Sequence, residues 1–171
     1  MSFLINPYLE SGEQLLYDQD ANGGVREAND YNSEIAQQFD TGYSFTNITK
    51  VVVYLRKFNT PTMNIKIGLW GSADLPNSPT VESDTTLNGS AITTSSPSGA
   101  YLPYDFEIPA TSLSGNNIKI GIITDVTNAS NYIQFAYSTA TLSDRQTVRE
   151  DGSNAWEAQR PQSFMMQVWG G

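Results

Sequence analysis

Apolar and polar residues alternate along most of this chain with a period of two, the pattern of a β-strand with one buried face. Residues 63–69 show it most clearly, because every second side chain is large and apolar. The pattern predicts further strands at residues 50–57, 101–108, 118–122, 132–137 and 164–169, with weaker candidates at 14–17, 34–39 and 155–158. The side chains expected to face the core are Val51, Val53, Leu55, Met63, Ile65, Ile67, Leu69, Leu102, Tyr104, Phe106, Ile108, Ile118, Ile120 and Ile122.

Turn-forming residues separate these runs. Pro, Gly, Asn, Asp or Ser cluster at residues 59–61, 114–117, 128–131 and 151–154. Short strands divided by such turns are typical of an antiparallel sandwich or barrel. The long Ser-, Thr- and Pro-rich segment at residues 75–97 is either a loop with short strands or an excursion that carries function.

A length of 171 residues predicts one domain. We expect residues 13–171 to form a single β-sandwich. Residues 1–12 precede it as an N-terminal arm or as its first edge strand. The candidate docking side chains of the arm are Phe3, Leu4, Ile5, Tyr8 and Leu9.

The composition excludes several kinds of chemistry. The chain has no Cys and no His, so it has no Ser-His-Asp triad, no Cys nucleophile and no ordinary zinc site. Charged residues make up 16% of the chain, below the roughly 25% of an average domain. Ser, Thr and Asn are abundant instead, and they favour turns and strand surfaces.

The net charge of −9 is concentrated near the start of the chain. Residues 1–40 hold eight acidic residues and Arg26 as the single basic one, which gives −7. This charge predicts no nucleic-acid partner. Residues 1–7 lack the pattern of a signal peptide, and no stretch approaches about 20 apolar residues. We therefore expect synthesis in the cytoplasm, without a signal peptide, and no membrane partner.

One stretch matches the start of a calcium-binding loop. Asp18, Asp20 and Asn22 alternate before a glycine, and their oxygens are ligands that Ca²⁺ prefers. Asn29 stands where such a loop has its bidentate Glu. The alternative is a simple turn, so calcium is a candidate ligand and no cofactor is required.

Exposed aromatic rings stack on sugars, which makes Trp70, Tyr101 and Trp156 candidate glycan-binding residues. Trp70 is out of phase with the inward residues of its run, which predicts a place at the surface. The alternative is that these rings fill or cover the core. Asp105 and Glu107 form the nearest pair of carboxylates, but the alternation places them on an outward face, so we expect no catalytic residues and no enzyme.

The order of several segments resembles a jelly-roll domain of bacterial surface proteins and of phage tail and head-fibre proteins. The segments are residues 36–42, 48–55, 63–70, 117–122, 131–138, 151–156 and 164–170. The resemblance covers about residues 30–170 and implies an all-β, antiparallel jelly-roll β-sandwich like that of carbohydrate-binding modules. It supplies no catalytic residues.

Two functions are compatible with these observations. The first is a non-enzymatic structural protein of a bacteriophage virion: a capsid decoration, head-fibre or tail component on the particle surface. Its partners would be other virion proteins and further copies of itself, with a trimer among the candidate states. The second is a glycan-binding module or adhesin domain that binds a cell-surface glycan. Because one fold serves many functions, the fold itself does not decide between them.

Overall fold

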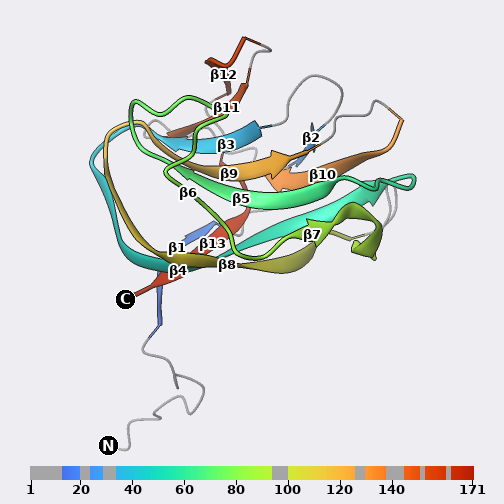
Figure 1. Cartoon of the computed structure of the whole chain (residues 1–171), viewed down its shortest axis with the longest axis horizontal. Coiled ribbons are helices and arrows are strands. Elements are labelled where there is room, and N and C mark those ends of the chain that lie inside the picture. Colours follow the sequence, from blue (N-terminus) through green and yellow to red (C-terminus); the bar gives the residue numbers. More distant parts are fainter. Residues whose placement is uncertain are drawn as a thin grey trace, which may run out of the picture.

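The chain folds into two antiparallel sheets that pack face to face (Figure 1). The computed structural model describes residues 13–19, 24–28, 34–93, 100–125, 130–137, 145–150, 153–160 and 163–171. Sheet A has the order β1 (Gln14–Gln19), β13 (Met166–Gly170), β4 (Tyr43–Phe58), β10 (Tyr132–Tyr137) and β2 (Gly24–Ala28), and β8 (Leu102–Gly115) also pairs with β4. Sheet B has the order β12 (Trp156–Arg160), β11 (Arg145–Glu150), β3 (Glu34–Phe39), β9 (Ile118–Thr124), β5 (Asn64–Trp70) and β6 (Val81–Glu82), and β7 (Leu87–Asn88) also pairs with β5.

The predicted antiparallel β-sandwich is thereby confirmed. Every segment that the alternation marked as a strand lies in a strand or overlaps one. Two strands are longer than the pattern indicated, since β4 begins at Tyr43 and β8 continues to Gly115. These two strands pair along most of their length.

Two connections carry the chain from one sheet to the other at the same end of the sandwich. They join β3 to β4 and β8 to β9, and Figure 1 shows them curving side by side. Gly115 and Asn117 have positive φ angles of 121° and 57°, which Gly and Asn tolerate best. The Asn116 side chain accepts a hydrogen bond of 2.6 Å from the N–H of Gly42 and so ties the two connections together.

Alternate apolar side chains from both sheets fill the space between them. The predicted inward residues of β4, β5 and β9 are all buried. Leu102 differs, because it is 36% exposed at the first position of β8, where the strand enters the sheet. A small void between the sheets has a volume of about 10 Å³, the room of a single water.

One buried polar side chain links the two layers inside this core. Gln37 of β3 is fully buried. Its Nε2 donates to the carbonyl of Gln146 (3.1 Å), and its Oε1 accepts from the N–H of Phe164 (2.8 Å). Because donors and acceptors are matched, the amide is accommodated without the cost of an unpaired buried group.

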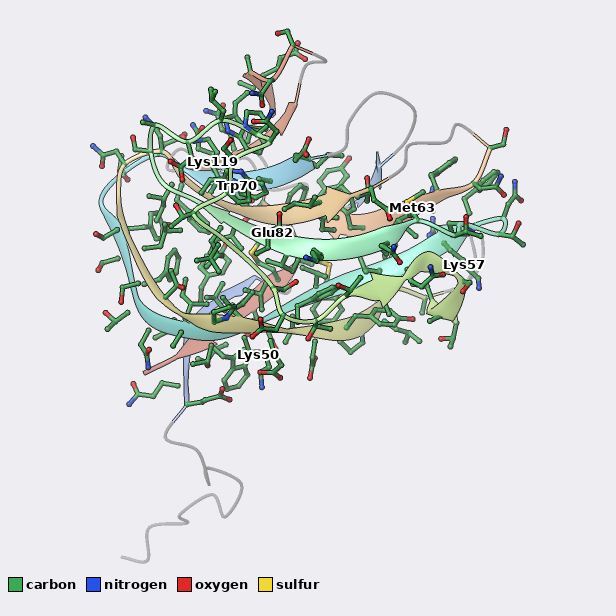
Figure 2. All side chains as sticks on the ribbon, in the orientation of Figure 1. Lys50, Lys57, Met63, Trp70, Glu82 and Lys119 are labelled. Carbon is green, nitrogen blue, oxygen red and sulfur yellow. The ribbon has the colours of Figure 1, made fainter. Side chains whose placement is uncertain are left out.

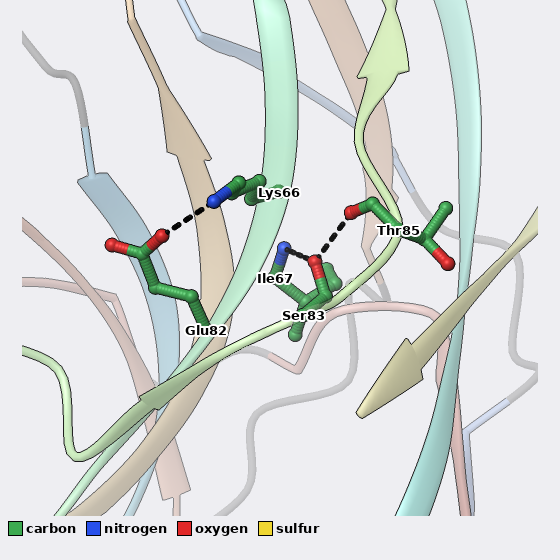
Figure 3. Close-up of polar contacts among 5 residues, drawn as sticks. All are labelled: Lys66, Ile67, Glu82, Ser83 and Thr85. Atoms are coloured by element: carbon green, nitrogen blue, oxygen red, sulfur yellow. Dashed lines mark hydrogen bonds and ion pairs between the residues drawn. The ribbon is translucent and has the colours of Figure 1, made fainter. Parts of the chain in front are cut away.

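Residues 75–93 run along the open side of the sandwich as a loop that contains the short strands β6 and β7. That the segment also carries function, the second expected alternative, stays a prediction. Ser83 takes the place of a strand partner at the edge of β5. Its N–H donates to the carbonyl of Ile67. Its Oγ accepts from the Ile67 N–H, as Figure 3 shows. Asp84 then donates its N–H to the carbonyl of Glu107 in β8. The segment therefore occupies edges of both sheets, which would otherwise be free to pair with other chains.

Across the part of the chain that the structure describes, no helix has the length and hydropathy needed to cross a membrane.

Candidate functional site

The outer face of sheet B carries aromatic, charged and amide side chains. Along β5 the outward residues are Asn64, Lys66, Gly68 and Trp70, along β9 they are Lys119, Gly121 and Ile123, and Asp125 follows directly after β9. The register places Trp70 beside Lys119 at one end and Lys66 beside Ile123 toward the other. These two ends have opposite environments.

The first end is covered and forms a second, smaller apolar cluster. Its buried residues are Ala36, Trp70 and Val148, and the partly buried Trp156 and Ile123 pack against them, with Ile123 at the boundary to the second end. The Trp70 ring lies over Gly68, and its Nε1–H donates to the carbonyl of Pro76 in the loop at residues 71–80 (2.9 Å). The Trp156 ring meets Trp70 edge to face, with 5.1 Å between ring centroids.

The predicted surface position of Trp70 is therefore wrong. The alternation correctly placed this side chain on the outer face, but the loop at residues 71–80 and Trp156 cover it, and its exposed fraction is 0%. A ring buried in this way cannot stack on a sugar. Trp156 remains half-buried, and its Nε1–H donates to the carbonyl of Asp74 (3.0 Å).

Lys119 lies beneath the same loop, next to Trp70 in Figure 2. It is 3% exposed, and its ammonium donates to the carbonyl of Asn117 at 2.7 Å and lies 5.6 Å from the centroid of the Trp156 ring. Burial lowers the pKa of Lys119 below its ordinary value, and the nearby carboxylate of Asp74 opposes that shift only in part. Sequence reasoning missed this residue, because an isolated lysine on an outward face is ordinarily solvated.

The second end is open and polar. A depression of about 370 Å³ is lined by Asn64, Lys66, Glu82, Thr86, Ile123 and Asp125. The Lys66 ammonium and the Glu82 carboxylate form an ion pair at 2.8 Å across β5 and β6 (Figure 3). Asp125 accepts from both the backbone N–H and the side-chain Nδ2 of Asn64, each at 2.8 Å.

None of the sequence-predicted site residues lines this depression. The sequence signal for these residues is weak: Asn64 and Lys66 alternate with the inward residues of their strand, but Glu82 and Asp125 belong to segments without a clear period. Glu82 contacts β5 only because residues 71–88 fold back along the edge of the sheet, and Asp125 contacts it from the residue after β9. No local sequence pattern predicts these contacts.

Tyr101 belongs to the other side of the molecule. It immediately precedes β8 of sheet A, and the Arg56 guanidinium lies 4.5 Å from the centroid of its ring. The three predicted glycan-binding aromatics thus do not share one groove, because Trp70 and Trp156 are in contact on sheet B. Asp105 and Glu107 are exposed on the outward face of β8, as the alternation predicted.

The predicted calcium and arm residues lie largely outside the described part of the chain. Asp18 is an exposed residue of β1 opposite Gln167. Asp20 and Asn22 are outside the described residues, as are Phe3, Leu4, Ile5, Tyr8 and Leu9. A search of the described residues finds no group of three or more acidic side chains placed to hold a metal ion. Calcium binding and the docking arm stay predictions.

Comparison of the chain with protein families, with curated proteins and with solved structures gives no match. The residues that the structure describes define this protein as an antiparallel β-sandwich with an apolar interior and a polar depression on the outer face of sheet B.

Proposed function

We propose that this chain is a non-catalytic structural protein displayed on the surface of a bacteriophage particle, as a capsid decoration, head-fibre or tail component. The observation that carries the proposal is the filled interior. Large apolar side chains occupy the space between the sheets, and the void there holds about 10 Å³. A sandwich of this kind offers outer faces for contact with partners rather than an enclosed site for a reaction.

The edge segment at residues 81–88 supports the same proposal. Subunits repeated at high density on a particle must avoid strand pairing between neighbouring copies. Ser83 and Asp84 occupy backbone groups of β5 and β8 that would otherwise be available for such pairing.

The proposal is tested by locating the chain in a phage lysate. Particles are separated from soluble protein on a density gradient, and the chain is detected by mass spectrometry and by gold-labelled antibody. We expect the chain to sediment with intact particles and the gold to lie on their outer surface, while a soluble host protein stays at the top of the gradient. Recovery of the chain only with the soluble protein would contradict the proposal.

A second candidate function, a glycan-binding module or adhesin domain, is favoured by the depression on sheet B. Its lining combines carboxylates, an amide, a hydroxyl and an ammonium around an apolar floor. Screening the protein against an array of bacterial surface glycans tests this function as a whole. Binding of any glycan supports it, and no binding by a multivalent form of the protein contradicts it.

A further inference from the structure

We propose that the depression between β5, β9 and β6 on the outer face of sheet B binds a short neutral saccharide. The inference rests on the second candidate function and names its site and ligand. The lining residues come from three parts of the chain that the fold brings together: Asn64 and Lys66 from β5, Ile123 from β9 with Asp125 just after it, and Glu82 and Thr86 from the edge segment. The volume of about 370 Å³ lies at the small end of ligand sites, which are roughly 300–1,000 Å³.

Part of the polar lining of the depression is oriented before any ligand arrives. Asn64 makes two hydrogen bonds with Asp125, whereas the exposed ion pair of Lys66 with Glu82 restrains its side chains less. Ser83, the residue after Glu82, anchors the edge segment to Ile67, and its Oγ donates to the carbonyl of Thr85 at 2.7 Å (Figure 3). Such preorganisation reduces the entropy lost when a ligand binds.

The lining of the depression combines hydrogen-bond donors and acceptors, which is what the hydroxyl groups of a sugar require. A hydroxyl both donates and accepts hydrogen bonds, so neighbouring hydroxyls of a sugar can donate to a carboxylate and accept from an ammonium or an amide. Each of the two pairs here, Lys66 with Glu82 and Asn64 with Asp125, offers one donor group beside one acceptor group. Ile123 is half-buried between them and provides the apolar surface against which the C–H groups of a sugar ring can pack.

The charges disfavour other ligand classes. The lining carries one positive charge, on Lys66, and two negative charges, on Glu82 and Asp125. An anion such as a phosphate or a uronic acid would meet this excess of negative charge. A metal ion would meet the Lys66 ammonium, which lies 2.8 Å from the Glu82 carboxylate.

The affinity of a single site is expected to be weak, because Lys66 and Glu82 must exchange part of their ion pair and their hydration for contacts with the sugar. Display of many copies on one particle would raise the overall affinity through avidity. The gain from avidity requires that the chain is displayed on a particle, as proposed above. Binding of a saccharide by the isolated chain does not require it.

The test is a titration of the isotope-labelled chain, followed by NMR, with the methyl glycosides of glucose, galactose, mannose, rhamnose and N-acetylglucosamine. We expect at least one glycoside to shift the amide resonances of residues in the depression, above all Lys66, Glu82, Thr86 and Asp125. Glucuronic acid should bind about fivefold more weakly than the matching neutral sugar, the factor that one like charge at 4 Å costs in water.

A blocking variant and a matched control complete the test. Thr86→Arg places a long side chain in the depression from an exposed loop position and should weaken glycoside binding by at least about tenfold. Thr46→Arg makes the same change at an exposed position of β4 in sheet A and should leave binding unchanged.

Four results would overturn the inference: no shift with any glycoside, shifts confined to another surface such as that around Tyr101, wild-type affinity in Thr86→Arg, or tighter binding of glucuronic acid or calcium than of the neutral sugars. If the glycan array is positive and these results still occur, the glycan-binding function stands and only its assignment to this depression fails. A negative array contradicts the function itself.

Discussion

The two ends of the outer face of sheet B share the same pair of strands and yet have opposite environments. Lys119 and Lys66 both point outward, from β9 and β5. Lys119 is 3% exposed beneath the loop at residues 71–80, whereas the side chain of Lys66 is 38% exposed beside the depression. At the first end the loop at residues 71–80 folds back over the sheet. The carbonyl of Pro76 accepts a hydrogen bond from Trp70, and the carbonyl of Asp74 accepts one from Trp156. At the second end the edge segment passes beside the sheet and leaves its face open.

This difference shows that strand period and burial are separate properties. The period of two decides which face of a sheet a side chain joins. Whether that face is buried depends on what the connecting segments place over it. The outer face of sheet B is therefore partly a second core and partly a surface available for binding.

The largest expected effect is at the covered end. Trp70→Ala should lower the free energy of unfolding by about 3–5 kcal/mol, because it empties a fully buried site and removes the contact with Trp156. Urea unfolding measures this loss. The matched change at the open end, Lys66→Ala, should cost less than about 1 kcal/mol. Equal losses in the two variants would contradict the contrast between the ends.

The next effect concerns the glycine under the Trp70 ring. A Cβ at Gly68 would overlap both the Trp70 ring and Cδ1 of Ile123, so Gly68→Ala should lower the free energy of unfolding by about 1–3 kcal/mol. At Gly71 a Cβ would meet its nearest neighbour, Oδ2 of Asp74, at an ordinary 3.4 Å. Gly71→Ala should change the same free energy by no more than about 0.5 kcal/mol. A neutral Gly68→Ala would mean that the ring does not lie on the sheet.

The pH dependence of stability reports on Lys119. Burial lowers its pKa in the folded state relative to 10.5 in the unfolded chain. Below the folded pKa both states bind the proton, and the cost of burying the charge is fully present. As the pH rises from the folded pKa toward 10.5, the folded state releases its proton first and stability increases.

Lys119→Met removes this dependence. The free energy of unfolding of the wild type, measured relative to that of the variant by urea unfolding, should therefore rise across that alkaline range. If the free energy of unfolding of the wild type instead falls relative to that of Lys119→Met as the pH rises, burial does not destabilise the charged form of Lys119, and the account is wrong.

The smallest effect is the ion pair at the open end. A double-mutant cycle of Lys66→Met and Glu82→Gln should give a coupling energy of about 0.2–1 kcal/mol, which decreases as salt is added. A coupling of several kcal/mol that resists salt would indicate a desolvated pair and would contradict an open depression.

The sequence alone predicted the main core well. Ile65, Ile67 and Leu69 are fully buried, as their alternation indicated, because a strand whose one face packs on another sheet must keep one face apolar. The turn at residues 114–117 was also predictable, since it requires positive φ angles at Gly115 and Asn117. These features are local, and local chemistry determines them.

The candidate site could not be predicted in the same way. The outward position of Trp70 was readable from its strand, but its burial depends on Pro76 and Trp156, which other segments supply. The depression likewise requires Glu82 and Asp125 to meet β5 through contacts between distant residues. Such contacts depend on the course of the loops, and the sequence of a loop has no periodicity from which its course could be predicted.

The reactivity of the lysines tests the contrast between the two ends most directly. The native protein is treated briefly with an amine-acylating reagent, and the modified residues are identified by mass spectrometry after digestion. The account predicts rapid modification of Lys66 and modification of Lys119 at least about tenfold slower, with the two rates becoming equal after unfolding in urea. Modification of Lys119 as fast as Lys66 in the native protein would show that the first end is not covered, and would contradict the account.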